Sequence, residues 1–373
     1  MKEHGILIIG GGLAGLTAAI HLASEGLDVA VIEMQPYPHH KVCGEYVSKE
    51  VEPYLKRLGV DLKVFGAVDI SKFQISTLDG FIIETDLPLG GFGISRFAFD
   101  QLLYTRAIEL GVTFYFEKVI NTAYDNNKFT ISTKSNTYTS KITLGAYGKR
   151  SILDKKMERA FSDKNQSWLA VKSHYKMANF PDKLVGLHNF EGGYGGLSKT
   201  ETGDVNFCYL VNYNSFKKYK DIHSFNSNVV AENPFLNKFL KNAEPIFDQP
   251  MTIAQIAFDK KESVVGHMLM CGDTAGLIHP LCGNGMAMAI HSAKIASELI
   301  VRYFNDPNYT RELLERDYRK LWSKEFSNRL WFGRRLQGIL LNNRLVSMGI
   351  KSVGKSKSIL KFIISKTHGQ LIS

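Results

Sequence analysis

A short apolar strand followed at once by closely spaced glycines constrains the fold of this chain more than any other feature. Residues 5–9 read GILII, and Gly10, Gly12 and Gly15 follow in the spacing Gly-x-Gly-x-x-Gly. The next residues predict a helix, and a second strand then ends in Glu33. A strand, turn, helix and strand within about 30 residues indicate a doubly wound α/β sheet that binds a dinucleotide.

Each glycine of this motif has a physical task. We expect Gly10 to turn the chain off the strand, Gly12 to let the backbone approach a pyrophosphate, and Gly15 to let the helix pack close to the sheet. The first helical residues, Leu13 and Ala14, then present free N–H groups and the positive end of the helix dipole to the phosphates.

Residues far along the chain decide which dinucleotide is bound. Glu33 is placed to accept hydrogen bonds from the adenosine ribose in either NAD or FAD. In residues 271–293, however, Gly272 and Asp273 follow a predicted strand, and residues 283–285 (Gly-Asn-Gly) precede a predicted helix. An acid there can bind a ribityl or ribose hydroxyl, and the helix dipole stabilises the negative charge of reduced flavin. We therefore predict FAD.

The chain leaves the nucleotide-binding region and returns to it. The middle, about residues 170–256, is rich in Asn, Gly, Tyr and Phe with short alternating runs, which predicts an antiparallel sheet. From residue 312 onward, apolar residues recur at helical intervals and suggest helical hairpins. The fold class that we predict is α/β. It comprises a discontinuous Rossmann-like FAD-binding domain (residues 1–70, 95–155 and 260–305), an inserted antiparallel-sheet substrate-binding domain (71–94 and 156–259) and a C-terminal helical region with a basic tail (306–373).

The position of the charge limits the partners. The net charge is +10, but residues 301–373 hold 15 Lys and Arg against 5 Asp and Glu, so residues 1–300 are neutral. A basic end on a neutral body indicates a local anionic contact, such as lipid headgroups, or merely a solvated helical face. Residues 349–373 fit an interfacial amphipathic helix. We expect no nucleic-acid partner. The lysines of this tail are Lys351, Lys355, Lys357, Lys361 and Lys366.

Cysteine usage and hydropathy predict the compartment. Cys43, Cys208, Cys271 and Cys282 lack metal-ligand spacing and are too few for a disulfide scaffold. Only about five apolar residues precede the glycines, fewer than a signal peptide needs. No window approaches the roughly 18 uninterrupted apolar residues of a spanning helix. We expect a cytoplasmic protein and leave open a peripheral contact with a membrane.

Three further elements carry a family resemblance. Residues 41–44 read Lys-Val-Cys-Gly, and Arg96 begins a predicted helix after Ser95. The third element is the second glycine pattern described above, in which Gly272 and Asp273 are followed by the Gly-Asn-Gly of residues 283–285. In these elements the chain resembles FAD-dependent oxidoreductases built like para-hydroxybenzoate hydroxylase, and within them the geranylgeranyl reductase-like branch. The resemblance covers about residues 5–340. It implies that Lys41, Cys43 and Gly44 lie beside the flavin and that Arg96 reaches the cofactor.

The chain also departs from these relatives. Residues 145–148 read Gly-Ala-Tyr-Gly where the class commonly has Gly-Ala-Asp-Gly, so the carboxylate of that loop is lost. Residues 192–196 keep only the Gly-Tyr part of the substrate element of the reductase branch. The Trp-x-Trp-x-Ile-Pro element of related flavin halogenases is absent from the sequence. The cofactor-binding residues that we predict are Gly10, Gly12, Leu13, Ala14, Gly15, Glu33, Lys41, Cys43, Gly44, Arg96, Gly148, Gly272, Asp273, Gly283, Asn284, Gly285 and Met286.

The resemblance implies a reductase-like FAD-dependent oxidoreductase, in which reduced flavin delivers a hydride to a double bond of an apolar or lipid-like substrate. Two alternatives remain open. One is a monooxygenase that hydroxylates an aromatic or polyketide-type substrate through a C4a-hydroperoxide, and the other is a flavin-holding electron-transfer protein. No second dinucleotide fingerprint follows a strand, so electrons come from transient NADH or NADPH or from a separate donor.

Several side chains are candidates for catalysis or substrate binding. Cys43, a thiol beside the flavin, and His279, an acid for a proton step, are the catalytic candidates. Tyr194 and Tyr209 are candidates for the substrate face, with core packing as the alternative. The adjacent His39 and His40 point apart on an extended loop, so we predict solvent-facing rings and no metal site.

Overall fold

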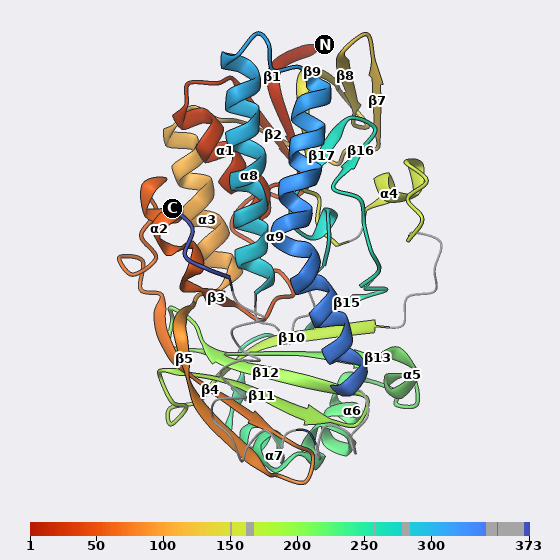
Figure 1. The fold of residues 1–373 in the computed structure, drawn as a ribbon. Helices are drawn as coiled ribbons and strands as arrows, with labels where there is room; N and C mark the ends of the chain where they lie inside the picture. Colours follow the sequence, from red (N-terminus) through yellow and green to blue (C-terminus); the bar gives the residue numbers. More distant parts are fainter. Residues whose placement is uncertain (150, 162–167, 257, 278–283, 341–348, 350–368) are drawn as a thin grey trace.

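The chain folds into two β-sheets, one in the upper and one in the lower part of Figure 1, with long helices in front of the upper sheet and short helices beneath the lower one. The computed structural model describes residues 1–373 except 150, 162–167, 257, 278–283, 341–348 and 350–368. No helix among the described residues is both long and apolar enough to span a membrane.

The first sheet contains the predicted nucleotide-binding strands. Its order is β16-β17-β9-β1-β2-β6, with the β7–β8 hairpin joined to β9. The central strand β1 runs parallel to both β2 and β9, and Ile9 pairs with Ile32 on one side and Gly145 on the other. The glycine loop therefore leaves the middle of a parallel sheet, at the carboxyl ends of its strands. The strands are β1 (Lys2–Ile9), β2 (Val29–Glu33), β6 (Thr113–Phe116), β7 (Asn121–Asp125), β8 (Lys128–Ser132), β9 (Thr137–Gly145), β16 (Val264–Val265) and β17 (Met268–Met270).

Helices from distant parts of the sequence cover this sheet. Helix α1 is buried from Leu13 to Leu22 and packs against α3 and α8. Ser95 caps α3 by accepting a hydrogen bond from the N–H of Ala98. In the C-terminal region the described residues form α9, a helix of 30 residues, and residues 341–348 and 350–368, on which the rest of the predicted helical hairpins falls, lie outside the described residues. The helical segments of this unit are α1 (Leu13–Ser24), η1 (Lys49–Val51), α2 (Glu52–Arg57), α3 (Arg96–Glu109), α4 (Ile152–Lys156), η3 (Gly272–Thr274), α8 (Gly285–Asn305) and α9 (Arg311–Leu340).

The second sheet is mostly antiparallel, as predicted for the middle of the chain. Its order is β14-β10-β13-β12-β11-β4-β5-β3, with β15 paired to β10 and a parallel pairing between β11 and β4. These findings confirm the α/β fold class. The strands are β3 (Tyr46–Ser48), β4 (Val68–Ser76), β5 (Ile82–Gly93), β10 (Trp168–Lys176), β11 (Leu184–Phe190), β12 (Gly193–Lys199), β13 (Val205–Asn212), β14 (Glu244–Pro245) and β15 (Met251–Ala254).

The two faces of the second sheet pack against different partners. The outer face is covered by α5 (Tyr213–Phe216), α6 (Ile222–Asn228), η2 (Val230–Glu232) and α7 (Pro234–Asn242), which bury an aromatic-rich core. The inner face contributes a separate apolar cluster. We call the first sheet with its helices the first unit and the second sheet with its helices the second unit; Leu277 of the first unit belongs to this cluster, and Val42 packs against it. Because side chains alternate along a strand, each strand supplies one set of residues to each face.

Candidate FAD site

The glycine loop is crowded where it packs and open where a phosphate would approach. Gly10 has a φ of +101°, and a Cβ atom there would collide with the backbone of Ala146. A Cβ atom on Gly15 would collide with the carbonyl oxygen of Gly10. At Gly12, in contrast, the nearest atom to a Cβ position is Arg96 Nη2 at 3.7 Å. The loop thus has the cradle that a dinucleotide pyrophosphate needs.

Glu33 lies beside this loop at the end of β2. Its Oε2 accepts a 2.7 Å hydrogen bond from the backbone N–H of Gly11, and the side chain is 7% exposed. The hydroxyl of Tyr37 donates a 2.5 Å hydrogen bond to the Gly11 carbonyl. The carboxylate is therefore held at the carboxyl edge of the sheet, where the prediction places the adenosine ribose.

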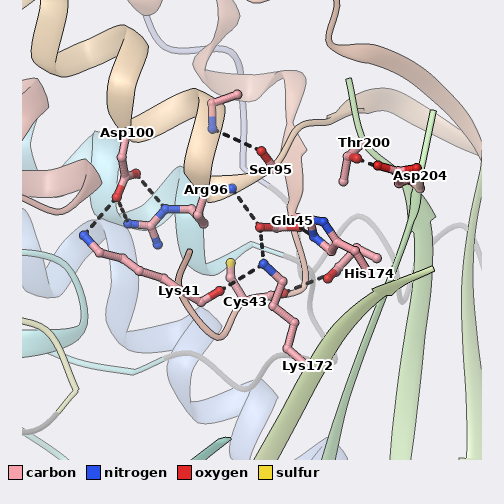
Figure 2. A network of polar contacts seen from close by, with 12 residues as sticks. Lys41, Cys43, Glu45, Ser95, Arg96, Asp100, Lys172, His174, Thr200 and Asp204 are labelled. Atoms are coloured by element: carbon pink, nitrogen blue, oxygen red, sulfur yellow. Dashed lines mark hydrogen bonds and ion pairs between the residues drawn. The ribbon is translucent and has the colours of Figure 1, made fainter. Parts of the chain in front are cut away.

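Two cations share one buried carboxylate next to the loop (Figure 2). Asp100 accepts hydrogen bonds of 2.7 and 2.8 Å from Arg96, and Lys41 Nζ lies 2.9 Å from Asp100 Oδ2. Burial alone raises the pKa of Asp100, but the charges of Arg96 and Lys41 hold it below its usual value. The structure thus places positive charge beside Gly12, where an anionic diphosphate fits.

The second glycine pattern packs directly against the first. Gly272 has a φ of +60°, and a Cβ atom there would lie 3.2 Å from Cβ of Ala14. Its N–H donates a 2.8 Å hydrogen bond to Ser292 Oγ in α8. Lys261 Nζ donates to the carbonyl of the next residue, Asp273, at 2.8 Å. The sequence did not single out Lys261 or Ser292, because neither belongs to a glycine pattern.

The loop that lacks the expected carboxylate adopts a different arrangement of contacts. Tyr147 occupies the position of the missing acid, and its hydroxyl donates a 3.1 Å hydrogen bond to Asp154. The N–H of Gly148 donates a 2.8 Å hydrogen bond to Thr274 Oγ1. No atom of the described residues beyond the chain neighbours lies within 4 Å of a Cβ position on Gly148. The turn therefore remains open beside the second glycine pattern.

The start of α8 is described from Asn284 onward. Asn284 is fully buried and donates a 3.1 Å hydrogen bond from Nδ2 to Glu50 Oε2. Gly285 and the buried Met286 follow as the first residues of the helix. Gly283 and the catalytic candidate His279 lie outside the described residues.

The Lys41–Glu45 loop lies between the two units (Figure 2). Cys43 is partly buried, and its carbonyl accepts a 3.2 Å hydrogen bond from Asn206 Nδ2 of β13. At Gly44 a Cβ position has no atom of the described residues within 4 Å other than its neighbours in the chain. The carboxylate of Glu45 bonds to Lys172 and His174 of β10, each at 2.6 Å.

Sequence reasoning missed this last group. Lys172 and His174 lie two positions apart on a strand whose intervening side chains belong to the opposite face. The signal available in the sequence was a cation and an imidazole on the same face of a strand that is otherwise rich in apolar residues. Their partner Glu45 is 127 residues from Lys172, so spacing alone does not join them.

The two tyrosines predicted for the substrate face lie on opposite faces of the second sheet. Tyr194 belongs to the inner apolar cluster, together with Leu187 and Leu210. Tyr209 belongs to the outer core and packs against Phe225. The reason is the register, because Tyr194 pairs with Leu210 and not with Tyr209. The geometry thus supports a substrate role for Tyr194 and a packing role for Tyr209.

His40 is not solvent-facing, in contrast to the prediction. Its ring packs against Phe97 and Phe247, each with a centroid distance of 4.7 Å. Among the described residues, His40, Glu45 and His174 offer possible metal-ligand atoms within 4.8 Å of one another. However, the Lys172 ammonium already neutralises the Glu45 carboxylate, and a dication there would leave an excess of buried positive charge. We therefore interpret Glu45, Lys172 and His174 as a hydrogen-bonded network, with the His40 ring packed beside it.

Comparisons with known proteins show which proteins the chain is similar to. The family model described as FAD dependent oxidoreductase matches residues 5–42. The chain is 21% identical to conditioned medium factor receptor 1 of Dictyostelium discoideum, over 87% of this chain and 68% of that protein. It is 24% identical to the digeranylgeranylglycerophospholipid reductase of Methanococcus aeolicus, over 87% and 83%. It is 23% identical to the menaquinone reductase of Mycobacterium tuberculosis, over 88% and 80%.

Solved structures share the fold over almost the whole chain. A flavin-dependent brominase superimposes with a TM-score of 0.81 at 17% identity, covering 98% of this chain and 93% of that one. A geranylgeranyl bacteriochlorophyll reductase-like protein from Thermoplasma acidophilum gives a TM-score of 0.77 at 18% identity, covering 98% and 97%. The matching family model over residues 5–42 and these relatives show that the chain is similar to FAD-dependent oxidoreductases, with geranylgeranyl reductase-like proteins among its structural neighbours.

Proposed function

We propose that this protein uses FAD to reduce a carbon–carbon double bond in an apolar, lipid-like substrate that lies against the inner face of the second sheet. One observation carries the proposal, namely the apolar cluster on that face beside the Cys43 loop. Two relatives that are named for a lipid and a quinone substrate support it. The members of the cluster are Ala170, Leu187, Tyr194, Leu210, Ile256, Phe258 and Leu277.

The residues of the first unit fit FAD and would hold it in two places. Gly12, Arg96 and the start of α1 would face the diphosphate, and Glu33 would face the ribose. Asp273 and the start of α8 would face the flavin end. When bound, FAD supplies the two-electron chemistry that none of these side chains provides. We propose that the first sheet and its helices form the FAD-binding domain and that the second sheet forms the substrate domain.

The chain itself would orient the substrate and supply a proton. Reduction of a double bond needs a hydride at one carbon and a proton at the other. Cys43 carries a thiol proton and lies between the two units, so we assign this role to it. Electrons would come from NADH or NADPH bound transiently, or from a separate donor.

A second part of the proposal concerns the source of the substrate. The five tail lysines lie outside the described residues, but their sequence pattern suits contact with an anionic membrane surface. Such contact would bring the enzyme to a lipid-like substrate without a spanning helix.

The test uses the FAD-loaded protein under anaerobic conditions. The flavin is reduced with NADH, NADPH or light, and a prenylated lipid, a menaquinone or an aromatic compound is then added. Reoxidation of the flavin without oxygen, together with product that has gained two hydrogen atoms, is the expected result. The opposite result is that only the aromatic compound is converted, and only after air is admitted, with a transient spectrum that matches neither oxidised nor reduced flavin. That result would establish a monooxygenase.

A further inference from the structure

Three side chains of the second sheet form hydrogen bonds to the loop that carries Cys43. Lys172 Nζ of β10 donates to the carbonyl of Lys41 at 3.2 Å, and Asn206 Nδ2 of β13 donates to the carbonyl of Cys43 at 3.2 Å. Lys172 and His174 also bond to the two carboxylate oxygens of Glu45. The second sheet therefore fixes both the backbone and the acidic end of this loop.

The same carboxylate reaches the first unit. Glu45 Oε1 accepts a 2.7 Å hydrogen bond from the backbone N–H of Arg96, the first residue of α3. The carbonyl of Glu45 accepts a further hydrogen bond from the N–H of Ile94 at 3.2 Å. Arg96 in turn lies beside Gly12. A single side chain thus links β10 to the helix end that faces the diphosphate cradle (Figure 2).

Burial of the charged groups of Glu45 and Lys172 costs free energy unless other groups compensate it. Glu45 and Lys172 are both 0% exposed, and taking two charges out of water is compensated only when each finds its partners. Glu45 also has a φ of +53°, in the left-handed region that strains a residue with a side chain. Burial alone raises the pKa of Glu45, but His174 and Lys172 hold it below its usual value. Strain and buried charge at one residue of a ligand site mark a positioning role.

We propose that Glu45 is a positioning residue that couples the substrate sheet to the flavin site. Through Lys172 and His174, Glu45 holds Cys43 and the Arg96 end of α3 in the geometry that receives FAD. This inference rests on the proposed FAD site, and it assigns to the sheet a direct influence on how the cofactor is seated.

Alkylation of Cys43 measures this coupling without any substrate. Iodoacetamide is added to protein with and without FAD, and the modified Cys43 peptide is quantified by mass spectrometry. Cys208 and Cys271 react slowly because burial raises the pKa of each thiol to about 12. FAD should slow alkylation of Cys43 in the unaltered protein by about tenfold or more, the effect of one well-placed charged hydrogen bond.

The variants Glu45→Gln, Lys172→Met and His174→Gln should reduce this protection to within about twofold, since each removes hydrogen bonds that seat the loop. The double variant Glu45→Gln/Lys172→Met keeps the charge balanced, so it should fold even where a single variant does not, and it should still lack protection. The matched controls Asp182→Asn and Lys199→Met remove a Lys–Asp pair elsewhere on the second sheet, in which the Asp182 side chain is 78% exposed, and should keep full protection.

Two results would overturn the proposal. One is that the double variant folds and retains the protection of the unaltered protein. The other is that FAD binds without slowing the alkylation of Cys43 in the unaltered protein. Failure of the proposed reductase function would instead show as an FAD-loaded protein that protects Cys43 but reduces no lipid or quinone, so the two outcomes are distinguishable.

Discussion

Arg96 Nη2 lies 3.7 Å from the point that a Cβ atom would occupy on Gly12, which is an ordinary van der Waals separation. A methyl group at Gly12 is therefore compatible with the fold but occupies the approach to the backbone. Gly15 differs, because a Cβ atom there would meet the carbonyl oxygen of Gly10. The two glycines of one motif thus have separable roles in binding and in packing.

Gly12→Ala should leave the thermal midpoint of the FAD-free protein almost unchanged and weaken FAD binding by about tenfold or more, the equivalent of roughly 1.4 kcal/mol. Gly15→Ala should lower the free energy of unfolding of the FAD-free protein by about 2 kcal/mol, because it overpacks the helix against the sheet. Fluorescence titration with FAD and urea unfolding measure the two effects. Equal effects of the two variants on FAD-free stability would contradict the separation.

Asp100 should make the stability of the protein sensitive to acid. Its pKa in the folded state is lowered by Arg96 and Lys41, so its stabilising contribution is present above the unfolded pKa and is lost as the pH falls through the folded value. Asp100→Asn should lower the free energy of unfolding at pH 7 by about 3 kcal/mol, because Arg96 and the partly exposed Lys41 lose their buried counter-charge.

Urea unfolding at a series of pH values tests this expectation. Below about pH 5 the unaltered protein should lose stability more steeply than Asp100→Asn. The control Asp182→Asn removes a carboxylate that is 78% exposed, and its effect should be small at every pH. Parallel pH profiles of Asp100→Asn and the unaltered protein would rule out the role of this carboxylate.

The sequence predicts those parts of the site that are encoded locally. The two glycine patterns, Glu33 and the start of α3 each lie within one short segment, where spacing determines the turn and the helix end. The bond between Glu45 and His174 joins residues 129 positions apart, and only the packing of the Lys41–Glu45 loop against β10 brings them together. Tyr194 and Tyr209 show the same limit, because the register of β12 against β13 decides which face each occupies.

The opposite faces of Tyr194 and Tyr209 lead to different mutant phenotypes. Tyr209→Ala should lower the free energy of unfolding by about 3 kcal/mol, since it opens a cavity in the outer aromatic core. It should leave the KM for a lipid substrate unchanged. Tyr194→Ala should raise that KM several-fold with little change in FAD occupancy, because Tyr194 belongs to the inner apolar cluster. A KM effect confined to Tyr209→Ala would assign the substrate to the other face.

The basic tail should bind anionic membranes. Polybasic segments gain about 1 kcal/mol per Lys near an anionic leaflet, before screening by salt. The protein should therefore sediment with vesicles that contain phosphatidylserine, remain in the supernatant with neutral vesicles, and be released by high salt. Replacing Lys351, Lys355, Lys357, Lys361 and Lys366 by Gln should abolish the binding.

Substitution is a better test here than deletion of residues 349–373. The N–H groups of Gly369 and Ile372 bond to the side chain and the carbonyl of Glu50, at 2.5 and 2.8 Å. Glu50 also accepts the hydrogen bond from Asn284 at the start of α8, so deletion would disturb the flavin end of the site as well. The variant in which the five lysines are replaced by Gln should therefore keep its FAD affinity but no longer bind to anionic vesicles. Equal recovery of the unaltered protein in the supernatant with anionic and with neutral vesicles would exclude a membrane role for the tail. The substrate would then have to reach the inner face of the second sheet from solution or from a carrier.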